Sequence, residues 1–191
     1  MALRHAVLAA LLDGEYSGYQ LAKVFDLGVS SFWHAVPQQL YTELSRLESE
    51  GLIVGRQVIQ HDRPNKRVYN VTPAGIAELE RFATIPVKPG LIREDLLVLV
   101  QAVDHISPTA VIAQLEERAL VTKAKAEMFE RNLEKLRGDL DEETFLRKGE
   151  PIGPYLNCLR GLAYETSVYE WLTSTARLLR ERTATDPEGP E

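Results

Sequence analysis

The residues of this sequence that are best suited to molecular recognition lie on one predicted helix, residues 37–51. Leu40, Leu44 and Leu47 recur at helical spacing and predict its buried face. Steps of about 100° per residue place amide, hydroxyl and guanidinium groups on the opposite face. These groups belong to Gln38, Thr42, Ser45, Arg46 and Ser49. The three glutamates of the segment fall on its flanks, so the outward face carries no carboxylate.

Amide, hydroxyl and guanidinium groups suit base edges and phosphate oxygens, which a carboxylate would mostly repel. A polar helix face that is simply solvated is the alternative explanation. The position of the helix in the chain favours a role in nucleic-acid recognition. A second short helix and a turn region precede it, as they precede the recognition helix of a helix-turn-helix.

The surrounding elements form a scaffold for this helix. Helices are predicted over residues 2–12 and 18–25, the second of them capped by Ser17. After the polar-faced helix, Val- and Ile-rich residues 52–60 and the run 67–71 flank turn residues and predict a β-hairpin. A fourth helix is predicted from Pro73 to Phe82, capped by Thr72. The order is that of a winged helix-turn-helix.

A separate helical domain is predicted beyond the Pro- and Gly-containing segment 84–90. We therefore divide the chain into a winged helix over residues 1–85, a helical domain over 86–182 and a disordered tail over 183–191. The helices expected in the second domain span residues 92–103, 109–136 and 155–182, with a connector over 138–154. The fold class is thus mostly α, with one small hairpin.

The last of these helices carries an apolar stripe at the three- and four-residue spacing of a coiled-coil seam. We predict an antiparallel, coiled-coil-like dimerisation domain in which a second subunit contacts this stripe, because the 109–136 helix covers only part of it. The predicted dimerisation residues are Tyr155, Leu159, Leu162, Tyr169, Leu172, Ala176 and Leu179.

The charge distribution also separates the two domains. The whole chain carries a net charge of −6, but residues 1–82 carry only −1 of it. The positive charge of the first domain gathers on the hairpin, at Arg56, Arg63, Lys66 and Arg67. Beside a recognition helix this cluster favours contact with phosphates or the minor groove; a solvated charged loop is the alternative.

Known catalytic and metal-binding motifs are absent from the sequence. It has no phosphate-binding loop and no histidine pair at metal-ligand spacing, and its single cysteine, Cys158, excludes an internal disulfide. We therefore expect no enzyme, no metal and no cofactor. The apolar run 6–12 is short for a signal sequence, and no run approaches the ~18 apolar residues of a membrane span. A cytoplasmic location is expected.

Four motifs of the first domain form a recognisable set: Gly18-Tyr19, Tyr41, Glu48-x-Glu50-Gly51-Leu52 and Thr72-Pro73-Ala74-Gly75. Through them, about 80 residues of the sequence resemble the PadR family of bacterial transcriptional regulators. The second half resembles, more loosely, the longer subgroup in which C-terminal helices dimerise, through Gly161, Glu165 and Trp171. Bulky residues before the polar-faced helix depart from the family pattern, and there Trp33 and His34 are expected to reach the DNA backbone.

This resemblance implies a homodimeric repressor that binds double-stranded operator DNA with inverted-repeat symmetry. It also implies that a small aromatic or lipophilic effector relieves repression. The predicted DNA-binding residues are Trp33, His34, Gln38, Gln39, Tyr41, Thr42, Ser45, Arg46, Arg63, Lys66 and Arg67. Tyr19 is predicted to be a core residue, and Trp171 a core or dimer contact. The alternatives are a winged-helix protein-interaction module and a coiled-coil adaptor, neither of which binds DNA.

Overall fold

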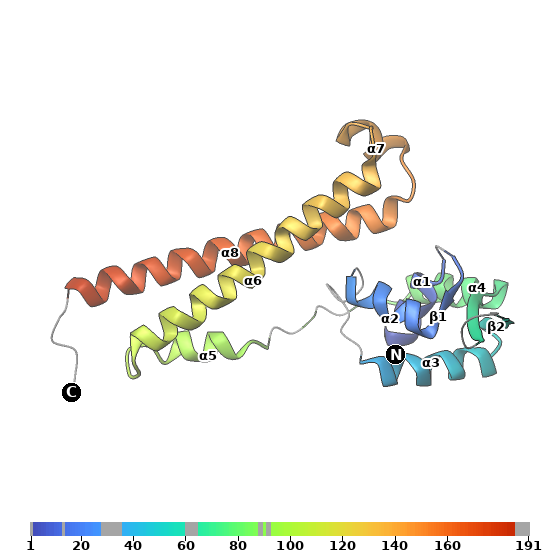
Figure 1. The fold of residues 1–191 in the computed structure, drawn as a ribbon, viewed down its shortest axis with the longest axis horizontal. Helices are drawn as coiled ribbons and strands as arrows, with labels where there is room; N and C mark the ends of the chain where they lie inside the picture. Colours follow the sequence, from blue (N-terminus) through green and yellow to red (C-terminus); the bar gives the residue numbers. More distant parts are fainter. Residues whose placement is uncertain are drawn as a thin grey trace. The chain divides into compact units, whose positions relative to one another are not determined.

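The computed structural model describes residues 2–12, 14–27, 36–59, 65–87, 90 and 93–185, and Figure 1 shows the fold. The chain forms two compact units that divide between Pro89 and Gly90, inside the segment that the sequence predicts as a linker. Each unit has a hydrophobic core of its own.

The first unit follows the predicted order of elements. Its elements are α1 (Ala2–Ala10), β1 (Tyr16–Ser17), α2 (Gly18–Leu27), α3 (Pro37–Ser49), β2 (Ile53–Val58), β3 (Lys66–Val71) and α4 (Pro73–Ala83). The hairpin β2–β3 is the wing. The sequence did not reveal β1, which pairs antiparallel with β3 through Ser17 and Val68. The sheet order is therefore β1-β3-β2.

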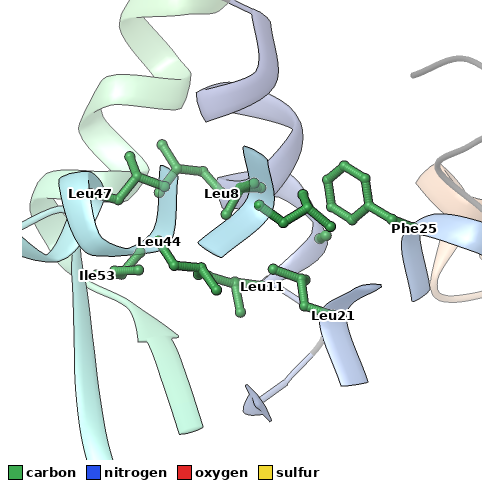
Figure 2. Close-up of a cluster of buried hydrophobic side chains, with 10 residues drawn as sticks. Leu8, Leu11, Leu21, Phe25, Leu44, Leu47 and Ile53 are labelled. Atoms are coloured by element: carbon green, nitrogen blue, oxygen red, sulfur yellow. The ribbon is translucent and has the colours of Figure 1, made fainter. Parts of the chain in front are cut away.

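Leucine side chains from several elements fill the core of this unit (Figure 2). The labelled residues Leu8, Leu11, Leu21, Phe25, Leu44, Leu47 and Ile53 are all at most 2% exposed. Each fully buried side chain of this size stabilises the fold by about 1.5–3 kcal/mol. Because α3 is anchored through its leucine face, its opposite face is held toward solvent.

The start of α2 confirms one prediction and corrects another. Ser17 accepts the Gln20 N–H at 3.3 Å, and the Gln20 side chain accepts the Ser17 N–H at 3.0 Å; together they form a reciprocal capping box. Tyr19, expected in the core, is 64% exposed. Its ring lies 4.8 Å from the Lys23 ammonium instead, because the helix turns positions 21 and 25 inward.

The end of α3, the wing and α4 pack closely together around Thr72 and Gly75. Thr72 donates its hydroxyl proton to the Gly51 carbonyl at 2.7 Å and accepts the Gly75 N–H at 3.2 Å. A Cβ at Gly75 would lie 2.2 Å from the Leu52 carbonyl oxygen. The Thr-Pro-Ala-Gly motif therefore lets backbone pack directly on backbone.

The described residues of the second unit, 90 and 93–185, form helices and connecting turns with no strand, and α6 and α8 lie side by side (Figure 1). Its elements are α5 (Asp95–Gln101), α6 (Pro108–Arg137), α7 (Glu142–Lys148) and α8 (Ile152–Thr185). The connector predicted over 138–154 contains α7, and α8 extends three residues into the predicted tail. Among the described residues, no helix is both long and apolar enough to cross a bilayer.

The predicted dimer seam on α8 packs mainly within its own chain. Tyr155, Leu172, Ala176 and Leu179 are at most 9% exposed, and the last three share a cluster with α6 residues such as Leu115. The expectation that α6 leaves much of this stripe uncovered is therefore wrong for these four residues. The reason is that α6 runs antiparallel to α8 and covers Leu172, Ala176 and Leu179. Tyr155 packs against Leu133 of α6 and Phe145 of α7.

The other three seam residues, Leu159, Leu162 and Tyr169, are partly buried and pack against the same intrachain clusters. Gly161 allows the close approach of the two helices, since a Cβ there would lie 2.5 Å from Cζ of Phe129.

Candidate nucleic-acid interface

Backbone interactions define both ends of α3. Pro37 opens the helix, and the Gln39 side-chain oxygen accepts the Val36 N–H at 3.2 Å. Val36 itself supplies no side-chain cap, as expected for an apolar residue there. At the other end, Gly51 adopts φ 72°, and the Leu52 N–H donates to the Leu47 carbonyl at 2.9 Å. This is a Schellman motif, which a glycine favours.

The outward face of α3 has the composition that the periodicity predicts. Its exposed residues are Gln38, Thr42, Ser45, Arg46 and Ser49. The hydroxyls of Thr42 and Ser45 donate to carbonyls one turn earlier, at 2.9 and 3.1 Å. Their oxygen lone pairs are thus left facing outward as acceptors. Gln38 adds an amide that can donate and accept together, the pattern that reads adenine in the major groove.

Arg46 is the cation of this face. Its Nε donates to Glu50 at 3.0 Å, and its side chain remains 62% exposed. Glu50 also accepts from Arg4 of α1, and these two hydrogen bonds, the one from Arg4 first, hold the pKa of the Glu50 carboxyl below its usual range. Arg46 is therefore oriented along the helix while its guanidinium stays open to a phosphate.

Tyr41 lies at the edge of the outward face. A Cβ on Gly18 would lie 2.3 Å from Cε1 of Tyr41, so the ring packs on the first residue of α2. The side chain is 46% exposed. The ring therefore packs against α2 while part of the side chain stays exposed, and the DNA contact predicted for Tyr41 stays a prediction.

The wing is less positive than its sequence suggests. Arg56 donates to Glu15 at 2.7 Å, and Arg67 donates to Glu48 at 2.6 Å. Two of the four cations counted there thus have carboxylate partners that lie far from them in sequence. Lys66, at the start of β3, is partly buried.

Three predicted DNA contacts lie outside the described residues. These are Trp33, His34 and Arg63. Among the residues that are described, His, Cys, Asp and Glu form no group that could hold a metal ion. The sequence did not predict that Glu15 and Glu48 pair with two arginines of the wing. The one local signal was Gly55, because a glycine inside a strand indicates a close approach of another group.

Family models match both units of the chain. Residues 7–81 match the transcriptional regulator PadR-like family, and residues 92–180 match the C-terminal domain of virulence activator alpha. A probable transcriptional regulator of Mycobacterium tuberculosis is 31% identical, over 95% of this chain and 100% of its own length.

Solved structures and a second relative agree with these matches. The negative transcriptional regulator PadR of Bacillus subtilis is 26% identical, over 93% of this chain and 97% of its own. The crystal structure of that protein with operator DNA has a TM-score of 0.76, with 26% identity, over 94% of this chain and 99% of the other. Its complex with p-coumaric acid has a TM-score of 0.70, with 26% identity over 93% and 95% of the two chains. On the sequence of both units and on this fold, the chain belongs to the PadR-like family of transcriptional regulators.

Proposed function

We propose that this protein binds an inverted-repeat DNA operator as a homodimer and represses transcription from it. The observation that carries the proposal is the outward face of α3, which presents an amide, hydroxyls and a guanidinium, with no carboxylate among its exposed residues. The leucines on the other side of the helix hold this face rigidly. The B. subtilis relative, whose structure contains operator DNA, supports the same use of the fold.

In this proposal α3 enters the major groove and the wing lies beside it. Gln38, Thr42 and Ser45 read base edges, while Arg46 and the Tyr41 hydroxyl meet phosphates. Gln39, whose side chain caps the helix, contributes by holding its first turn. Lys66, Arg63, Trp33 and His34 are retained as proposed backbone contacts.

The subunit contact is proposed on a second face of α8. Tyr164, Trp171 and Leu178 recur every seven residues and remain exposed although they are large and apolar. Each of them precedes a residue that is buried against α6 (Glu165, Leu172 and Leu179), so the stripe lies about 100° around the helix from the intrachain seam. A heptad stripe left open on a long helix favours a second helix as its partner.

A small aromatic effector is proposed to release the DNA. The support is the relative's complex with p-coumaric acid, together with the fold that it shares with this chain. A protein that acts in this way would work in the cytoplasm, on the nucleoid.

Selection of bound fragments from genomic DNA tests the proposal. The expected result is a dyad-symmetric motif with half-sites roughly one helical turn apart, and binding to duplex well above binding to single strands. Fragments without a dyad, or equal binding to both forms of DNA, would overturn it. Sedimentation equilibrium on the same preparation should show a dimer.

A further inference from the structure

One carboxylate oxygen connects the recognition helix to the wing. Oε1 of Glu48, in the last turn of α3, accepts from Nη2 of Arg67 on β3 at 2.6 Å and from the backbone N–H of Gly55 on β2 at 2.9 Å. Both strands of the hairpin are thereby bound to the same point of α3.

The sheet register shows why Arg67 points toward α3. Gly55 pairs with Tyr69, and Gln57 pairs with Arg67. Successive side chains of a strand alternate between the two faces of a sheet, so Arg67 shares a face with Tyr69 and Val71. These two residues pack against the core that α3 helps to form. The guanidinium therefore extends back along the protein side of the wing.

Gly55 leaves room for this arrangement. A Cβ there would lie 2.5 Å from Oε1 of Glu48 and 2.4 Å from Nε of Arg67. Any side chain at this position would displace one partner of the ion pair. The glycine, the glutamate and the arginine thus form one unit, although they lie on three different elements.

The charges of the pair support each other. The hydrogen bond from Arg67, followed by that from Gly55, holds the pKa of the Glu48 carboxyl below its usual range, against the opposing effect of burial. The same contact raises the pKa of Arg67. Both groups therefore stay ionised at neutral pH, and neither is a free charge.

We infer that Glu48 is a positioning residue for DNA binding, which holds the wing at a fixed angle to α3, and that Arg67 acts through Glu48 and is not a phosphate ligand. The inference rests on the proposed function and revises the phosphate role that the sequence analysis gave to Arg67. An exposed ion pair contributes little to stability, so the effect is expected in DNA affinity more than in folding.

Replacing Glu48 distinguishes a phosphate-binding Arg67 from a wing-positioning Glu48, because the two roles predict opposite changes in DNA affinity. If Arg67 were a phosphate ligand, Glu48→Ala would remove a negative charge, release the cation and tighten binding. If Glu48 positions the wing, the same change should weaken operator binding by about 2- to 150-fold, the usual range of coupling between contacting residues. Glu43→Ala is the charge-matched control on the same helix and should not weaken binding. Glu48→Gln keeps an acceptor oxygen and should recover part of the loss.

The salt dependence of binding gives a second readout. Removing a phosphate ligand lowers the slope of log K against log salt by roughly 0.9. Arg67→Ala should instead weaken binding with little change of slope, and the Glu48→Ala/Arg67→Ala double variant should bind no more weakly than Glu48→Ala alone. Tighter or unchanged binding by Glu48→Ala, or a slope lowered by about one in Arg67→Ala, would overturn the inference.

Amide hydrogen exchange measures the contact between Glu48 and the wing without DNA, so its result does not depend on the proposed function. The Gly55 N–H, which donates to Glu48, should exchange faster in full-length Glu48→Ala than in the wild type, whether or not DNA is bound. A wild type that binds no operator would refute the proposed function alone. A wild type that binds while Gly55 exchange and affinity are both unchanged in Glu48→Ala would refute the positioning role alone.

Discussion

Replacing Gly75 by alanine sets helix propensity against packing. Gly75 lies inside α4, where alanine is ordinarily favoured over glycine by about 0.8–1.0 kcal/mol. The new Cβ, however, would lie 2.2 Å from the carbonyl oxygen of Leu52, which also accepts the Thr72 N–H at 3.0 Å. Overpacking costs about 1–3 kcal/mol, and a weakened hydrogen bond adds about 0.5–1.5 kcal/mol.

The balance predicts that Gly75→Ala lowers the free energy of unfolding of the first unit by about 1–3 kcal/mol. The clashing atom belongs to the backbone, so the strain cannot be relieved by rotating a side chain. Peptide-resolved hydrogen exchange of the full chain measures this unit separately from the helical one. Gly153→Ala, where a Cβ meets nothing within 4 Å, is the control and should cause no loss. A Gly75→Ala protein that exchanges more slowly than the wild type would show that propensity dominates and would refute the packing argument.

The remaining predictions concern the dimer, the acid stability and the base contacts. Trp171→Glu should leave α8 folded but dissociate the dimer in sedimentation equilibrium, whereas Leu172→Ala, at a side chain that is 0% exposed, should destabilise the helical unit by about 2–5 kcal/mol in urea unfolding. The hydrogen bond from Arg81, followed by that from His5, lowers the pKa of Glu78 from 4.5 to about 2. Its stabilising contribution is therefore present above pH 4.5 and is lost as the pH falls toward 2; Glu78→Gln should flatten the acid limb of a stability–pH curve over that interval. Gln38→Ala should relax preference at one base pair by about 1–3 kcal/mol without changing the salt slope, and an unchanged preference would remove Gln38 from the reading face.

Patterns that lie within one element could be predicted from the sequence. The leucine periodicity of α3 determined which of its faces is buried, and therefore which polar groups are presented. Proline at the start of α3 and glycine at its end determined its limits, because these residues act through their own backbone geometry. The hairpin and the linker followed from equally local composition.

Pairing between distant residues could not be predicted in this way. Arg56 and Arg67 were counted as free cations of the wing, but their partners Glu15 and Glu48 lie 41 and 19 positions away. Only the folded chain brings these groups together. The two-residue strand β1 was missed for the same reason, since it is defined by its pairing with β3.

The apolar stripe of α8 shows most clearly the difference between what the sequence determines and what the tertiary fold adds. The sequence by itself determined that Leu172, Ala176 and Leu179 must be covered, because their spacing puts them on one side of a helix. It did not determine what covers them, because the hydrophobic effect is non-directional and rewards any apolar partner. The tertiary structure assigns that role to α6 of the same chain. It leaves Trp171, one position away, exposed at the surface.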